Sequence, residues 1–275
     1  MFIYRILAAV AAILGAAMGV IRIFEVRGGY EASGLAVAGD TNRMILIVCT
    51  LVFVVAAVVL SLGLHTSDRR NSPRAFTHPS RAISLVYFAA MCLFVVTALF
   101  MILGCIGSFS APTLISGLLL FFACAGMILL SFLLAKAIFP QDLSFVALIP
   151  TFWACYQLIL SFRAETQNPV MSAYIFEVSA LVFMVLTFFF QAGMLYNRKI
   201  LRRTYFATTV SLFLCTLCGV SKLVLGISDI SAKAHLFDKV TMLAPGFMYF
   251  GGAVYAAYVL LCLLREHVDS TPTAN

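Results

Sequence analysis

The sequence predicts an all-α fold: a polytopic membrane helix bundle of about eight transmembrane helices, with both termini cytoplasmic. Of its 275 residues, 63% are hydrophobic and only 11% are charged, whereas soluble domains carry about 25% charged residues. Apolar runs of roughly 20 residues recur along the chain, and each is long enough to cross a hydrocarbon core of about 30 Å. The basic residues gather in short loops between these runs, which is typical of membrane proteins.

The first four spans are predicted at residues 6–24, 44–64, 82–105 and 113–135. The first could be a signal peptide, because Arg5 precedes the apolar run and residues 17–19 imitate a cleavage site. A retained helix is favoured, since the run is long enough to cross. It also carries Ala11, Gly15 and Gly19 at four-residue spacing, a small-residue ridge that lets another helix backbone approach closely.

The other four spans are predicted at residues 144–162, 171–195, 205–226 and 240–264. The fifth and sixth form a hairpin around a short polar turn. Pro150 and Pro245 lie inside apolar spans, where a proline leaves a backbone carbonyl without its usual partner. We expect one transmembrane domain over residues 1–264, because no polar block is long enough to fold separately. Residues 265–275 are then a cytoplasmic polar tail.

The orientation follows from the distribution of Lys and Arg. With the N-terminus inside, 11 basic residues lie on the cytoplasmic side and 6 on the outer side, with Lys222 left within a span. Both dense basic clusters, at 69–81 and 198–203, then lie in the cytoplasm, as the positive-inside rule requires. A seven-span alternative that dropped a segment between the clusters would place them on opposite sides of the membrane. Eight spans therefore fit better.

The net charge of +7 would indicate nucleic-acid binding in a soluble protein. Here orientation during insertion explains it better, so the expected partner is the lipid bilayer and no nucleic acid. Basic residues close to a membrane surface also attract anionic lipid. The candidates for such contacts are Arg69, Arg70, Arg198, Lys199, Arg202 and Arg203.

Three polar residues lie inside apolar spans at similar depths. Gln157, Glu177 and Lys222 each fall four to six residues from the predicted outer end of their spans, or roughly 6–9 Å at 1.5 Å per residue. Each belongs to a helical stripe, on spans five, six and seven respectively, that is expected to face other helices because polar groups in hydrocarbon are costly. The sequence therefore predicts that three helices share one site.

This site has two interpretations. As an outward-facing pocket, Glu177 and Lys222 would recognise opposite charges on a small solute, with Trp153, Tyr156 and Tyr174 as walls. The protein would then be a transporter or the substrate-binding subunit of one. In the alternative, Glu177 and Lys222 form a structural ion pair, in a non-transporting sensor, assembly factor or scaffold. Lys222 could also extend to the outer interface.

Catalytic motifs are not found. The sequence has no H-E-x-x-H, G-x-S-x-G or Walker A pattern, and its four histidines fall on both sides of the predicted membrane. The eight cysteines lie in or at the ends of apolar spans, and Cys215-x-x-Cys218 is expected to pack within a helix rather than bind zinc. We therefore expect no enzyme activity, metal or cofactor.

The segments IPTFWACYQLILSF and NPVMSAYIFE, with the basic exit YNRKILRR, resemble a group of uncharacterised bacterial multi-pass membrane proteins. The resemblance covers about 50 residues and implies a bacterial cytoplasmic membrane, with nothing about mechanism. The general layout is also similar to that of the substrate-binding subunits of energy-coupling-factor transporters, although eight spans depart from the usual six. That likeness is an analogy at the level of fold.

Overall fold

The computed structural model describes residues 2–29, 40–63, 76, 80–107, 109–135, 141–165, 171–196, 200–230 and 236–269. Over these residues the chain is helical, with eight helices long and apolar enough to span a membrane, as the sequence predicts. They are α1 (Phe2–Gly28), α2 (Thr41–Leu62), α3 (Arg81–Gly107), α4 (Ala111–Ala135), α5 (Ile149–Glu165), α6 (Met171–Leu195), α7 (Leu201–Ile230) and α8 (Leu236–Asp269). A 3-10 helix, η2 (Gln141–Leu148), leads into α5.

Several helices run past the ends of the predicted spans. α1 extends to Gly28 and α7 to Ile230, each about one turn beyond its expected end. α8 continues to Asp269, into the expected tail, because no proline or glycine stops it before Pro272. Helices of more than 25 residues exceed the roughly 20 that cross a membrane, so their ends reach the interfacial layers.

Of the two prolines, Pro245 lies inside a helix as the sequence predicts, and Pro150 does not. Pro150 is the second residue of α5, in the first turn, where its missing N–H has no intrahelical partner to lose. Pro245 does lie inside α8, and the helix continues on both sides of it. Only Pro245 therefore sits where a proline removes a helical hydrogen bond.

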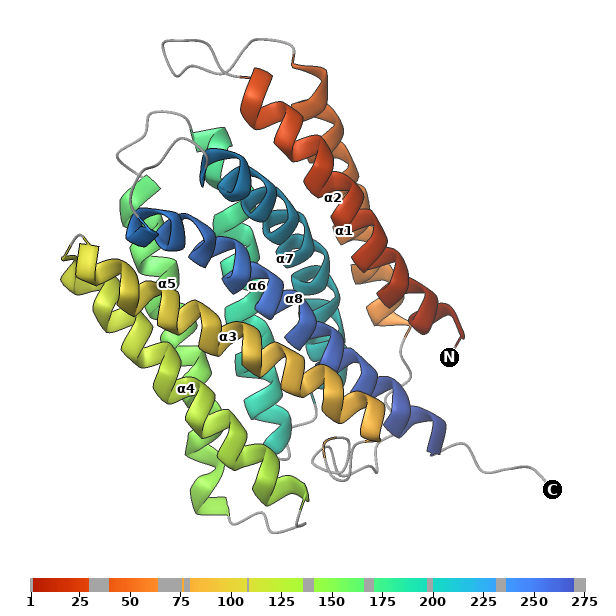
Figure 1. Ribbon diagram of the computed structural model, residues 1–275. Helices are drawn as coiled ribbons and strands as arrows, with labels where there is room; N and C mark the ends of the chain where they lie inside the picture. The colour runs from red at the N-terminus through yellow and green to blue at the C-terminus, as the bar shows by residue number, and fades with distance from the viewer. Residues whose placement is uncertain are drawn as a thin grey trace.

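α7 and α8 form the centre of the bundle (Figure 1). α7 is rich in hydroxyl and thiol side chains, yet these are buried, as the stripe on span seven predicts. The hydroxyls donate to their own helix: Thr208 bonds the carbonyl of Thr204 at 2.6 Å, and Thr209 that of Tyr205 at 2.8 Å. Such bonds satisfy a polar group without a partner from another helix.

Glycines allow the close helix packing. An added Cβ at Gly15 would lie 2.6 Å from the carbonyl oxygen of Phe213 on α7, and one at Gly19 would lie 2.8 Å from Cβ of Val220. The predicted ridge on the first span is thus confirmed as the surface where α1 meets α7. In a bilayer, where water does not drive helices together, such close contact supplies much of the attraction.

The other helices pack around this centre. α1 and α2 lie against α7 on one side, α3 packs along α8 on the other, and α4, α5 and α6 complete the bundle (Figure 1). The start of α1 and the end of α8 lie at the same end of the molecule, as an even number of crossings requires. The basic-residue count predicts that this end is cytoplasmic.

An aromatic cluster fills the space between α3, α5, α6 and α8. Phe94 packs edge-on against Trp153 at 5.7 Å between ring centroids, and Tyr255 lies 4.9 Å from Phe188. Tyr255 also donates a hydrogen bond to the side-chain oxygen of Gln191, and this span-six glutamine is buried in the core. These contacts hold α5 against the centre of the bundle through side chains.

Candidate functional site

Glu177 on α6 and Lys222 on α7 form an ion pair, with 2.8 Å between Oε1 and Nζ. Their side chains are partly buried, at 17% and 33% exposed. Tyr249 on α8 donates to the backbone carbonyl of Glu177 at 3.5 Å, so a third helix reaches the same level. Glu177 and Lys222 therefore lie at the same level of the bundle, as the sequence predicts for spans six and seven.

Gln157 does not join this pair. Its side-chain oxygen accepts a 2.6 Å hydrogen bond from Ser116 on α4, so it faces α4 rather than α7. The side chain of Tyr156 also faces α4, since its hydroxyl donates to the carbonyl of Pro112 at 3.3 Å. α5 packs between α4 and α6, and the side chains of Tyr156 and Gln157 reach α4. The expected three-helix site is thus divided between two separate interfaces.

Gln157 instead lines a polar groove of about 390 Å³ between α3, α4 and α5, hereafter the α4–α5 groove. The polar side chains along it are Ser110, Thr113, Ser116, Gln157, Ser161 and Arg163. They lie near the end where α3 and α5 finish and α4 begins, which the basic-residue count predicts to be the outer end. No aspartate or glutamate is among the described residues that line it.

The chemistry of this groove favours hydrogen-bond acceptors. The bond from Ser116 occupies the oxygen of the Gln157 amide, so the NH₂ group is the part oriented to donate. Arg163, which also has an interaction partner of its own, adds a guanidinium group to the lining. Ser110 and Thr113 hold each other with 3.0 Å between their hydroxyl oxygens. The arrangement suits a small carboxylate, phosphate or carbonyl compound.

Two other predicted site residues, Trp153 and Tyr174, are buried. Trp153 is 1% exposed and packs on Phe94, so it is a core residue and not the wall of an open pocket. Its indole nitrogen has no hydrogen-bond partner among the described residues. Tyr174 is also buried, at 6% exposed. The helical stripe correctly placed these rings inward, but periodicity does not distinguish a core from a cavity.

An ionic cluster that the sequence patterns did not predict lies at the end of α1. Glu25 is fully buried and pairs with Arg22 one turn earlier and with Arg43 on α2, where Nε lies 3.1 Å from Oε1. Arg43 also donates to the carbonyl of Gly29 at 3.2 Å. The guanidinium of Arg22 lies 5.2 Å from the ring centroid of Phe176, the neighbour of Glu177.

The signal for this cluster was present in the sequence. Arg22 and Glu25 are three residues apart, a spacing that brings opposite charges together on a helix. The predicted first span ends at residue 24, so Glu25 fell outside the predicted helix and its pairing with Arg22 was not expected. In the structure α1 continues to Gly28, so both residues are helical.

The proposed lipid contacts are only partly covered by the structure. Arg202 and Arg203 lie in the first turn of α7, at the end of the bundle that holds the start of α1. Arg69, Arg70, Arg198 and Lys199 lie outside the described residues. Cys215 and Cys218 are fully buried within α7. Within the part of the chain that the structure describes, no group of three or more His, Cys, Asp or Glu residues is placed to hold a metal.

Fold and site together define a multi-pass integral membrane protein with a partly buried ion pair, an ionic cluster and a polar groove near one end. Comparisons of the chain with protein-family models, curated proteins and solved structures find no match.

A double-mutant cycle on Glu177→Gln and Lys222→Met measures whether the pair is a structural lock. We expect a coupling of about 1 kcal/mol, above most exposed pairs because both side chains are partly buried, and below the fully buried case. The measurement is thermal unfolding of both single variants and the double variant in detergent. Additive losses within about 0.3 kcal/mol would mean that the contact contributes nothing to stability.

Proposed function

We propose that this protein binds a small polar solute in the α4–α5 groove, at the outer face of a bacterial cytoplasmic membrane. The observation that carries the proposal is the Ser116–Gln157 hydrogen bond inside a groove of about 390 Å³, a size within the usual range of about 300–1,000 Å³ for small-molecule sites. A polar side chain held by its neighbour is oriented before a ligand arrives, which lowers the cost of binding.

The donors in the groove support an acceptor-bearing solute of neutral or negative charge. Arg163 and the Gln157 amide would bind a carboxylate or phosphate, and the hydroxyls of Thr113 and Ser161 add adaptable contacts. The role is binding rather than catalysis, because no pairing of nucleophile and base lies among these side chains. The outer location rests on the basic-residue count.

The Glu177–Lys222 contact favours a second candidate. Because each charge is paired with the other at 2.8 Å, neither is held open for a solute, as the scaffold or assembly-factor interpretation expects. On this view the protein is a non-transporting membrane component. The two candidates make different predictions about the groove: only the first expects ligand binding that depends on Gln157.

The test is a thermal-shift screen of the purified full chain against small carboxylates, phosphates, amino acids and nucleobases. A ligand that binds only the folded state stabilises it by mass action, by about 2.7 kcal/mol at 100 times its Kd. We expect an acidic compound to raise the unfolding temperature, and Gln157→Leu to remove at least most of that shift. Ser116→Ala should reduce it, since the amide loses its orienting partner.

Ser131→Ala is the matched control for Ser116→Ala. Ser131 is also on α4, but its hydroxyl donates to the carbonyl of Ile128 on the same helix at 2.8 Å, and it does not line the α4–α5 groove. The ligand shift should be unchanged in this variant. A full shift retained by both Gln157→Leu and Arg163→Gln would exclude the groove as the binding site.

A further inference from the structure

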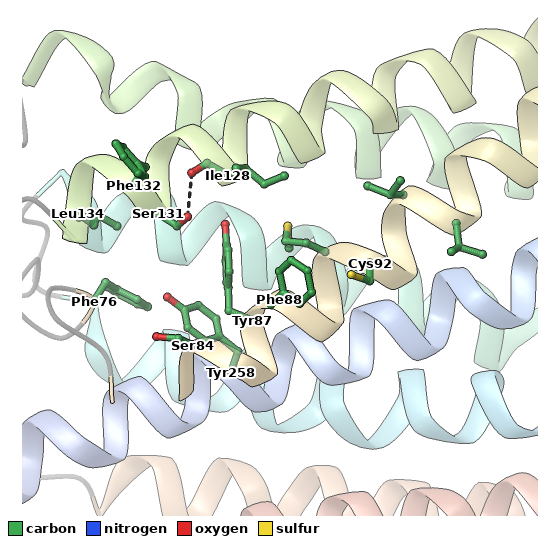
Figure 2. Close-up of a pocket in the computed structure, with 13 residues that line it drawn as sticks. Phe76, Ser84, Tyr87, Phe88, Cys92, Ile128, Ser131, Phe132, Leu134 and Tyr258 are labelled. Atoms are coloured by element: carbon green, nitrogen blue, oxygen red, sulfur yellow. Dashed lines mark hydrogen bonds between the residues drawn. The ribbon is translucent and has the colours of Figure 1, made fainter. Parts of the chain in front are cut away.

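A second and larger cavity lies between α3 and α4, at the opposite end of α3 from the α4–α5 groove. This α3–α4 groove has a volume of about 680 Å³ and is lined by 13 residues, mainly apolar and aromatic (Figure 2). α3 runs along one side and α4 along the other. Tyr258 of α8 and Phe76 close one end.

The floor of the groove is firmly held. The hydroxyl of Tyr87 donates to the carbonyl of Met127 at 2.5 Å, which ties α3 to α4. The ring of Tyr258 packs on Tyr87 at 4.7 Å between centroids, and Phe76 lies beyond it at 6.5 Å. The hydrogen bond joins α3 to α4, and the packed rings of Tyr87, Tyr258 and Phe76 line this end of the groove.

The groove is polar at one end only. The hydroxyl oxygens of Ser84, Ser131, Tyr87 and Tyr258 gather at the end near Phe76 (Figure 2). Further along α3 the lining is Met91, Val95 and Val96, with Cys92 as the most polar group. An occupant of matching chemistry has one polar end and one apolar chain.

The length of the groove corresponds to one bilayer leaflet. From Ser84 to Val96 the lining extends over twelve residue-to-residue steps of α3, about 18 Å at 1.5 Å per step. Half of a hydrocarbon core of about 30 Å is about 15 Å. The groove starts one turn inside the beginning of α3 and ends near the middle of the membrane, which is where the acyl chain of that leaflet ends.

The groove opens sideways into the surrounding lipid. Phe88 and Phe132, on its two rims, are 68% and 60% exposed, and Ile128 is 51% exposed. Because these side chains belong to membrane-spanning segments, the medium outside them is hydrocarbon. An occupant therefore enters from the bilayer and does not need to cross a polar loop.

A positive charge lies at the polar end. Arg81 is the first residue of α3 and is exposed, and it is three residues before Ser84, on the same face of the helix. Arg81 lies about 4.5 Å from Ser84 along the helix axis, toward the start of α3, and its side chain reaches the level of the lipid headgroups. A basic residue close to the membrane surface attracts the negatively charged headgroups of anionic lipids.

We propose that the α3–α4 groove is a specific site for one acyl chain of an anionic phospholipid from the leaflet in which α3 begins. The chain lies along Met91 and Val95, the hydroxyls of Ser84 and Tyr258 face its ester region, and Arg81 pairs with the headgroup. The site is separate from the α4–α5 groove and does not depend on solute binding there.

The test is native mass spectrometry of the delipidated full chain in a mild detergent, titrated with phosphatidylglycerol or with phosphatidylcholine of the same acyl chains. We expect one phosphatidylglycerol to bind ahead of all others, with about fivefold preference over phosphatidylcholine. Cys92→Trp places a ring in the groove and should weaken this first binding about tenfold or more, since displacing even two methylene groups has that effect. Arg81→Gln should remove the preference and retain the binding.

Matched controls separate the site from general effects. Val59→Trp adds the same ring to an exposed position of α2, and Arg27→Gln removes an exposed charge at the other end of the bundle. Both should bind lipid as the unmodified chain does. Ile128→Trp fills the groove from the α4 side. It replaces Cys92→Trp as the test variant if Cys92→Trp lowers the unfolding temperature.

Three results would overturn the proposal. The first is unchanged lipid binding when Cys92→Trp and Ile128→Trp both remain folded. The second is equal loss of binding in Val59→Trp, which would indicate a non-specific lipid annulus. The third is a dimer mass that Cys92→Trp converts to a monomer, which would mean that a second copy of the chain covers the groove.

Discussion

Replacing Glu25 with glutamine is expected to lower the free energy of unfolding by about 3–5 kcal/mol, the usual cost of removing one partner from a buried ion pair. Glu25 is 0% exposed, and its carboxylate faces two guanidinium groups, those of Arg22 and Arg43. Glutamine preserves the shape but removes the charge, so two positive side chains, 4% and 14% exposed, lose the carboxylate that offsets their desolvation. Thermal unfolding in detergent measures the loss.

Arg27, about half a helical turn after Glu25 on α1, provides the control for this experiment. Arg27→Gln also removes one charge from the last turns of α1, but Arg27 is exposed, so the change should stay within about 0.5 kcal/mol. If Glu25→Gln and Arg27→Gln had the same small effect, the cluster would not be a stabilising contact between α1 and α2. The loss of unfolding free energy in Arg43→Met should be intermediate between those of the other two variants, because Glu25 still pairs with Arg22.

Gly15→Val is expected to destabilise the bundle by about 3 kcal/mol, at the upper end of the usual range for overpacking. Even a single added carbon would lie 2.6 Å from the carbonyl oxygen of Phe213 and 3.0 Å from Cβ of Thr216. The obstacle is largely α7 backbone, which cannot rotate away as a flexible side chain would. α1 must therefore shift, and it loses part of its contact with α7.

Gly28→Ala is the matched control for Gly15→Ala, since both add one carbon to a glycine of α1. Nothing lies within 4 Å of the carbon added at Gly28, so that variant should unfold within about 0.5 kcal/mol of the original chain. Gly15→Ala should cost at least about 1 kcal/mol. Equal unfolding temperatures for the two alanine variants would show that α1 and α7 are not in close contact.

The eight helices were predictable because a bilayer imposes a simple rule. Every backbone polar group inside hydrocarbon needs an internal partner, so a long apolar run becomes a helix whatever its neighbours are. The ridge at Gly15 and Gly19 and the buried stripe of α7 were predictable for a related reason, since small and polar residues avoid lipid. The predicted ends of the helices were less accurate, as α8 shows. The apolar span ends where the membrane interface begins, but the helix itself can continue into the polar layer.

The candidate site was predictable only in part. Periodicity gave the depth and the inward direction of Glu177 and Lys222, and the structure brings the two into contact. For Gln157 the direction was also inward, but α5 has neighbours on two sides, and the sequence does not say which one the stripe meets. Pairing with Ser116 is a consequence of where α4 packs.

By itself, the sequence determined the class of protein, the number of crossings and the residues that avoid lipid, because these depend on the transfer of each segment from water to hydrocarbon. Only the tertiary structure decided which polar groups meet: Glu177 with Lys222, Gln157 with Ser116, and Glu25 with two arginines. It also decided where cavities remain, between α4 and α5 and between α3 and α4. The reason is that a cavity depends on the packing of several helices at once, while hydropathy describes each helix alone.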